Sequence, residues 1–390
     1  MKTHSNTLFT PIAAALAGLS LAFLGAASPA RGAAITYVPR LLAKIGDVVG
    51  GKTLTGFQNA PSINDAGSVV YEADFAGGSG VFSETALLVS TGVNIDGKTL
   101  LGLQSSALLN NAGSAAFLGA FNGGTGIFSQ NLLLAATGRI VAGKTLLTLP
   151  SLPSLNSTGT VAYFATYNGG SAIFTQTTQV VATGETIGGK SLTGLGAPSL
   201  NDAGLVAFRG TFNGGSGIFT QNGLLIATGE TLSGKTLTGF GVLPSLNDNG
   251  QTAFLADYSG GSGIFTQNGL LVATGQVVGG KTLTDLGDPF LGNDGTVAFL
   301  AFFNGGQGIF TQDGLIVATG SVVDGKTISL LGAPSLNSSG SVAVTATFTD
   351  GTRGVVVASA AVPEPGAGAL LLAGAALASS VRRRRGILRA

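Results

Sequence analysis

The 390-residue sequence predicts an all-β protein, a seven-bladed β-propeller built from seven repeats of 45 or 46 residues. The composition is the first observation, because 64 glycines and only 9% charged residues indicate many tight turns and argue against a disordered chain. The second is a recurring N-x-x-G motif, since repeats of this length with four short strands are typical of propeller blades. Its glycine falls at Gly67, Gly113, Gly159, Gly204, Gly250, Gly295 and Gly340. The third is that the two ends of the repeat region complete each other.

The local signals within one repeat, Ser199 to Gly241, predict hairpins. The run LVAFRGTF alternates and is followed by NGGS, whose asparagine and glycines suit a turn with positive φ. GIFTQ then leads to Asn222-Gly223, a strong hairpin signal, and to LLIATG. These runs predict three strands, and KTLTGFG predicts a fourth before a proline-containing link to the next repeat. No segment has a sustained helical period.

The ends of the repeat region predict that the ring is closed. Leu41–Leu54 matches Leu270–Leu283, so the region starts part-way through a repeat, and it ends after the first two strands of another. N-terminal strands would therefore complete the last blade, which leaves no free edge. The alternative, an open β array, would need polar capping repeats, and none is visible.

Residues 1–34 are predicted to form a secretory signal peptide. Lys2 precedes an apolar run from Ile12 to Leu24, and small residues then allow cleavage after Ala30 or Ala34. The repeat domain is expected to cover residues 35–361. The protein is therefore expected to be exported.

The last residues, 362–390, combine a short motif, an apolar segment and a basic cluster. Gly366–Val381 is apolar, and arginines beside an apolar segment stay on the cytoplasmic side of a membrane. The motif and cluster residues are Pro363, Glu364, Pro365, Arg382, Arg383, Arg384 and Arg385. This tail resembles a PEP-CTERM sorting signal. The alternative is an ordinary C-terminal anchor.

The resemblance implies sorting by exosortase, a membrane-embedded peptidase that recognises the Pro-Glu-Pro motif. The apolar helix would anchor the chain in the membrane transiently. After processing, the protein would reach the cell envelope, the cell surface or the extracellular matrix, often in association with exopolysaccharide.

The repeats themselves resemble the tandem NxxGxxAF family of bacterial exported proteins. The motif stands as NDAGLVAF, NDNGQTAF and NNAGSAAF, with looser copies elsewhere, and the sixth repeat has Gly292 in place of the asparagine. The resemblance implies an exported tandem-repeat domain and no known activity.

The N-x-x-G motif is interpreted as turn chemistry, with an asparagine-supported turn and a glycine at positive φ, so that the following Ala and Phe pack between blades. The alternative is calcium binding by Asp65, Asp202 and Asp248. Two repeats carry Ser157 and Ser338 instead, and no dense series of acidic ligands occurs.

The residue inventory excludes several chemistries. The only histidine is His4, inside the predicted signal peptide, and there is no cysteine, which excludes His-dependent catalysis and His or thiolate metal sites in the repeat domain. Residues 35–361 hold twelve basic residues against seventeen acids, so no nucleic-acid partner is expected. We expect a structural or binding module. The alternative is a carbohydrate-active lyase or hydrolase that uses carboxylates in the channel.

Four charged residues stand where the other repeats are mostly apolar or small: Glu72, Asp74, Arg209 and Asp257. A polar pocket near the channel mouth would use them for a sugar or a peptide. The alternative is that they simply face solvent.

One lysine recurs in every repeat: Lys52, Lys98, Lys144, Lys190, Lys235, Lys281 and Lys326. In a propeller these lysines are expected to ring one face and could attract an acidic extracellular polysaccharide. The alternative is a solvated loop charge that discourages edge-to-edge association.

Each lysine belongs to a match to the phosphate-loop pattern G-x-x-x-x-G-K-[ST], as in GQVVGGKT from Gly275 to Thr282. A phosphate loop needs a following helix, whereas TLTDLG is a poor helix start. Because the pattern recurs in every repeat, we interpret it as an inter-strand loop with its lysine facing water. Neither ATPase activity nor a cofactor is expected.

Overall fold

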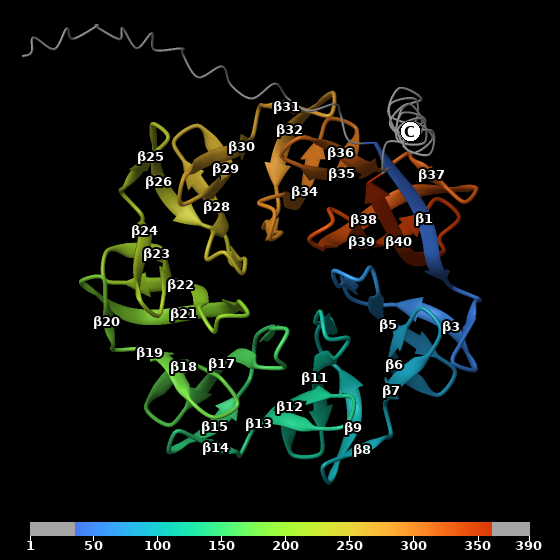
Figure 1. The fold of residues 1–390 in the computed structure, drawn as a ribbon, viewed down its shortest axis with the longest axis horizontal. Helices are drawn as coiled ribbons and strands as arrows, with labels where there is room; N and C mark the ends of the chain where they lie inside the picture. The colour runs from blue at the N-terminus through green and yellow to red at the C-terminus, as the bar shows by residue number, and fades with distance from the viewer. Residues whose placement is uncertain (1–35, 361–390) are drawn as a thin grey trace, which may run out of the picture. The chain divides into compact units, whose positions relative to one another are not determined.

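The computed structural model describes residues 36–360, which form seven small β-sheets arranged in a ring (Figure 1). This part of the chain contains strands and no helix, so it has no helix able to cross a membrane. The predicted signal peptide, with Ala30 and Ala34, and the predicted sorting signal lie outside the described residues. The predicted all-β, seven-bladed propeller is confirmed.

The strands group into blades, which are numbered in chain order. Blade 1 consists of β2 (Val48–Val49), β3 (Lys52–Phe57), β4 (Ser62–Ile63), β5 (Val69–Phe75), β6 (Gly78–Ser83) and β7 (Leu87–Ser90). Blade 2 consists of β8 (Asn94–Ile95), β9 (Lys98–Leu103), β10 (Leu108–Leu109), β11 (Ala115–Phe121), β12 (Gly124–Ser129) and β13 (Leu133–Ala136). Blade 3 consists of β14 (Ile140–Val141), β15 (Lys144–Thr148), β16 (Ser154–Leu155), β17 (Val161–Tyr167), β18 (Gly170–Phe174) and β19 (Gln179–Ala182). Blade 4 consists of β20 (Thr186–Ile187), β21 (Lys190–Leu200), β22 (Val206–Phe212), β23 (Gly215–Thr220) and β24 (Gly223–Ala227).

The remaining blades follow the same plan. Blade 5 consists of β25 (Thr231–Leu232), β26 (Lys235–Phe240), β27 (Ser245–Leu246), β28 (Thr252–Tyr258), β29 (Gly261–Thr266) and β30 (Gly269–Ala273). Blade 6 consists of β31 (Val277–Val278), β32 (Lys281–Leu286), β33 (Phe290–Leu291), β34 (Val297–Phe303), β35 (Gly306–Thr311) and β36 (Gly314–Ala318). Blade 7 consists of β37 (Val322–Val323), β38 (Lys326–Leu336), β39 (Val342–Phe348), β40 (Arg353–Ala360) and, from the other end of the chain, β1 (Tyr37–Lys44).

The last strand of each sequence repeat lies in the next blade, which corrects the predicted grouping. Lys235–Phe240 forms β26 and pairs with β28, not with β24 of its own repeat. Leu237 is completely buried beside Phe254 of blade 5, so tertiary packing chooses the partner sheet. Local strand signals carry no information on this choice, because either neighbouring sheet would satisfy them.

A short link interrupts the first long strand of most blades. In blade 1, β3 pairs with the end of β5 (Leu54 with Phe75) and β4 pairs with its start (Ile63 with Val69). In blades 4 and 7 the same path is one bulged strand, β21 or β38. The link lies between the recurrent lysine and the N-x-x-G glycine, which is where repeats of 45 and 46 residues differ in length.

The ring closes inside blade 7. β1 pairs antiparallel with β40, from Tyr37 opposite Ala360 to Lys44 opposite Gly354. The predicted closure is confirmed and sharpened, because a single N-terminal strand completes the blade and the following residues already begin blade 1.

The hydrophobic core lies between neighbouring blades. One cluster joins Ala162 and Ile173 of blade 3 to Phe208 and Phe219 of blade 4. Phe208 and Phe219 stack at 5.8 Å between ring centroids, and Phe212 meets Phe219 edge-on. The expectation that the Ala and Phe of the motif pack between blades is therefore confirmed.

Candidate functional site

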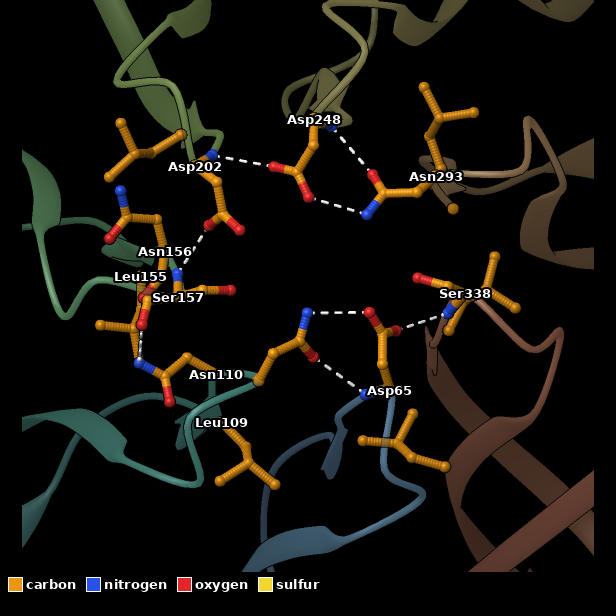
Figure 2. Close-up of a pocket in the computed structure, with 16 residues that line it drawn as sticks. Asp65, Leu109, Asn110, Leu155, Asn156, Ser157, Asp202, Asp248, Asn293 and Ser338 are labelled. Carbon is orange, nitrogen blue, oxygen red and sulfur yellow. Dashed lines mark hydrogen bonds between the residues drawn. The ribbon is translucent and has the colours of Figure 1, made fainter.

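The N-x-x-G turns of all seven blades converge on the ring axis and line a cavity of about 210 Å³ (Figure 2). We call this the axial cavity. Around it stand the second residues of the seven motifs: Asp65, Asn111, Ser157, Asp202, Asp248, Asn293 and Ser338. These side chains come from repeats far apart in the chain, and only the closed ring brings them together.

The first asparagine of each motif performs two tasks. In blade 4, Oδ1 of Asn201 accepts the backbone N–H of Leu205 (2.8 Å), which supports the turn. Its Nδ2 donates to the backbone carbonyl of Asn247 in blade 5 (3.1 Å). The same pair of bonds is made by Asn64, Asn110, Asn156, Asn247 and Asn337, all buried. Turn chemistry is confirmed, and the bridge to the next blade is a role that sequence reasoning missed.

Two further bridges cross the boundaries between blades, which we call seams. In one, the side chain at the second motif position accepts a backbone N–H from the preceding blade, as Asp248 does from Asp202 (2.8 Å). In the other, a serine just before the motif accepts a backbone N–H from the following blade, as Ser199 does from Leu246 (3.0 Å).

Five of the seven seams carry all three bridges, and two do not. Seam 2/3 has only the asparagine bridge. At the second motif position Ser157 replaces the longer Asp or Asn acceptor, and before the motif Leu108 replaces the serine hydroxyl. Seam 6/7 has none of the three, because Phe290, Gly292 and Ser338 occupy the bridging positions. In blade 6 Asp294 supports the turn instead, accepting the backbone N–H of Thr296 at 2.9 Å.

The carboxylates around the axial cavity are engaged with neighbouring blades. Asp65 accepts from Ser338 N and Asn111 Nδ2, and Asp248 accepts from Asp202 N and Asn293 Nδ2. Within residues 36–360 no three acidic or other metal-binding side chains stand close enough to hold one ion. The geometry of these aspartates is that of inter-blade bridges.

Glu72 and Asp74 lie together in blade 1. Glu72 is only 2% exposed and accepts a hydrogen bond from Asn59 Nδ2 at 2.6 Å. Burial raises the pKa of Glu72 to about 7, against the opposing effect of the Asn59 bond. Asp74 accepts from Gln58 Nε2 at 2.8 Å.

The other two charged departures lie elsewhere. Arg209 is half-buried in blade 4, and Asp257 is exposed in blade 5. None of the four lines the axial cavity. The structure therefore does not bring Glu72, Asp74, Arg209 and Asp257 together into one pocket.

The seven recurrent lysines begin the second strand of short hairpins, the rim hairpins, which lie at the outer edge of the ring (Figure 1). Each Nζ lies over an aromatic ring of its own blade, 4.7 to 5.8 Å from the centroid. The aromatic partners are Phe75, Phe121, Tyr167, Phe212, Tyr258, Phe303 and Phe348. The lysines remain partly exposed to solvent, and the π-face beneath each ammonium is an additional favourable contact that the sequence reasoning did not anticipate. In every repeat the lysine recurs together with an aromatic residue just before a glycine-containing turn, and this joint recurrence could have predicted the contact.

The phosphate-loop match is a rim hairpin. Gly279 and Gly280 have φ of +56° and +75°, and Val278 pairs with Lys281 across the turn. A Cβ on Gly279 would lie 2.5 Å from Cβ of Leu315, so side-chain size is limited here as well. A strand, β32, follows where a phosphate loop needs a helix.

Solved structures similar to this chain include two lyases and a protein named YCF48. Virginiamycin B lyase from Staphylococcus aureus, in a catalytically inactive form with quinupristin, is 10% identical, with 83% of this chain and all of that chain covered and a TM-score of 0.37. A streptogramin B lyase is 11% identical over 83% and 98% of the two chains, with a TM-score of 0.39. YCF48 from Cyanidioschyzon merolae is 12% identical over 83% and 98%, with a TM-score of 0.34. At these identities and TM-scores, the similarity gives no information about an activity of this protein.

A family match covers most of the chain. The sequence matches the family of unknown function DUF7453 over residues 39–326 and, in an overlapping second match, over residues 226–369. No curated protein matches it. The protein therefore belongs to the DUF7453 family.

Proposed function

We propose that this propeller is an exported, exosortase-sorted structural and binding module of the cell surface or extracellular matrix, associated with acidic exopolysaccharide. The sequence of both chain ends supports the export and sorting part of the proposal. The propeller fold supports the module part, because such a ring presents one rigid platform to its surroundings.

The observation that carries the binding part is the rim. Seven lysines are held in place over aromatic rings, so each ammonium is positioned before any ligand arrives. Preorganisation lowers the entropy cost of binding, and repeated weak contacts add up along a polymer. An acidic polysaccharide offers such a repeated negative charge.

We favour a binding role over the carboxylate-enzyme alternative because of Glu72. Its raised pKa is typical of catalytic carboxyls, but at 2% exposure its side chain lacks the contact with solvent that a substrate would need. Its surroundings indicate a structural role in blade 1.

Retention on immobilised polyuronate, compared with neutral dextran, tests the binding. Wild type should be retained at low salt and released as salt screens the charges. A variant with all seven rim lysines replaced by glutamine should pass through, while the matching arginine variant keeps charge and stacking and should be retained. Equal retention of the glutamine variant would refute the role of the rim.

Export and sorting need a separate measurement. Mass spectrometry of the native protein should find an N-terminus after Ala30 or Ala34 and a C-terminus near Pro363–Pro365. A native chain that retains Arg382–Arg385 would contradict sorting by exosortase.

A further inference from the structure

Two cavities adjoin at the seam between blades 2 and 3. The larger, about 600 Å³, is lined by uncharged residues that include Gln104, Thr125, Leu147 and Thr148. The smaller, about 560 Å³, lies against the rim hairpin of blade 2. Thr137 lines both cavities, and each volume falls in the roughly 300–1,000 Å³ range of small-molecule sites.

Two positively charged side chains, Lys98 and Arg139, line the smaller cavity. Lys98 rests over the ring of Phe121 at 4.8 Å. Arg139 donates through Nη1 to the carbonyls of Leu133 and Leu134, at 3.3 and 2.8 Å. A guanidinium has five N–H donors, so Arg139 is fixed in place and keeps donors for a ligand.

The cavity also contains one acid, Asp96. Its carboxylate accepts the backbone N–H of Leu133 at 2.7 Å, so it is bound to the strand. The net charge of the cavity remains positive.

Arg139 is a departure from the repeat. The equivalent residues of the other repeats are Asp47, Val93, Glu185, Glu230, Gln276 and Ser321. Three of them are acids, and none is basic. Arg139 is therefore the one basic residue at this position of the repeat.

The larger cavity carries a second departure from the repeat. Thr148 occupies a position that is glycine in four other repeats, and its hydroxyl lies 2.7 Å from that of Thr166. Leu147 is 53% exposed beside it. Hydroxyl and amide groups next to exposed aliphatic carbon match the two sides of a sugar ring, its hydroxyls and its C–H face.

We propose that these adjoining cavities form a groove for an acidic polysaccharide, with Lys98 and Arg139 binding the carboxylate of a uronic acid unit and the Thr/Gln/Leu cavity holding the next sugar. The inference rests on the proposed function and names its principal site. Charge-assisted bonds to the carboxylate supply specificity for acidic sugars, and the uncharged cavity supplies contact area.

Titration of the full-length protein with oligogalacturonate, and with maltooligosaccharide as the neutral probe, tests the groove. Arg139→Gln introduces the residue found at the equivalent position after β30 of blade 5, Gln276, and Thr125→Gln introduces the residue found at the equivalent position in blade 6, Gln307. We expect each to weaken oligogalacturonate binding roughly tenfold or more, and Arg139→Lys to weaken it less. Arg40→Gln removes an exposed positive charge from β1 in blade 7, outside both the rim lysines and the groove, and is the control; it should change affinity less than about twofold.

The outcomes separate the two proposals. If wild type binds oligogalacturonate and both glutamine variants bind it equally well, the groove is not the binding site, while the proposal of acidic-glycan binding is supported. If wild type does not bind oligogalacturonate, both proposals fail. Thermal unfolding of each variant identifies any that does not fold, and Arg139→Gln, at an exposed position, then decides alone.

Discussion

Seams 7/1 and 6/7 both belong to blade 7, yet they are held together in different ways. At seam 7/1, Asn337 Nδ2 bonds to Asn64 O (2.9 Å), Ser338 N to Asp65 (2.7 Å) and Ile63 N to Ser335 Oγ (3.1 Å). At seam 6/7 none of these three bridges forms.

The two seams also differ in how the chain joins them. From blade 6 the chain runs directly from β36 into β37 and β38, so blade 7 is covalently joined there. Toward blade 1 the only covalent route runs through β1, which is attached to β40 by strand pairing alone. Seam 6/7 also has a buried bond farther from the axis, from Gln307 Nε2 to Leu331 O at 2.7 Å. Chain continuity alone does not decide where axial bridges form, because seams 1/2, 3/4, 4/5 and 5/6 are also continuous and carry all three. Seam 6/7 lacks them because of its residues, and there the chain and the Gln307 bond join the blades without axial bridges.

Removal of β1 should have the largest effect, because it opens the ring at seam 7/1. A chain that begins at Ile45 leaves the edge of β40 unpaired and exposes core around Ala43. We expect the melting temperature to fall by on the order of 10 °C or more, since a whole strand contributes several kcal/mol. Added peptide YVPRLLAK should restore part of the loss. Unchanged thermal unfolding would contradict closure by β1.

Asn337→Ala should weaken seam 7/1 by loss of its side-chain bridge and turn support. Because the site is buried, the unpaired backbone groups should cost about 2–4 kcal/mol of unfolding free energy. Urea denaturation measures this. Asn249→Ala is the exposed counterpart: its Nδ2 also bonds across a seam, to Asn293 O of blade 6 at 2.7 Å, but in contact with solvent. Three repeats carry alanine there, and the change should alter stability by less than about 0.5 kcal/mol.

Glu72, in blade 1 next to seam 7/1, should make the stability of the protein depend on pH. Glu72 accepts from Asn59, whose carbonyl accepts from Thr345 Oγ1 of blade 7 at 2.8 Å. The pKa of Glu72 rises from its ordinary value of 4.5 to about 7 in the folded protein. The folded state therefore binds the proton more tightly, and the resulting stability is full below pH 4.5 and lost as pH rises through about 7.

Glu72→Gln should remove this dependence. Urea denaturation between pH 5 and pH 8 should show wild type losing up to about 3 kcal/mol and the variant nearly constant. A wild-type protein as stable at pH 8 as at pH 5 would rule out the buried carboxyl as a source of pH sensitivity.

An asparagine bridge added at seam 6/7 should make that seam resemble seam 7/1 and stabilise it. A Cβ on Gly292 would lie 2.8 Å from Oδ1 of Asp294, so the change Gly292→Asn is made together with Asp294→Ala. The new amide should reach the carbonyl of Asn337 and stabilise the protein by about 1 kcal/mol. Hydrogen exchange of the blade 7 turn should slow. A loss of stability would mean that blade 6 is adapted to its glycine.

The candidate sites were predicted less completely than the fold, for a physical reason. The turn role of Asn201 was predictable, because its Oδ1 acceptor acts on a backbone N–H four residues away. Its bridge was not, because the carbonyl of Asn247 is a full repeat away and is reached only through the ring. Lys98 and Arg139 likewise belong to different repeats and meet only through the fold of blade 2.

The sequence by itself determined the number of blades, the hairpins and the closure of the ring, because these depend on periodicity, on glycines at positive φ and on matching chain ends. Only the tertiary structure decided which blade receives the last strand of each repeat, which seams carry bridges and where the rim lysines rest. Those features depend on contacts between residues many positions apart, whose geometry is set when seven blades pack face to face and share their cores.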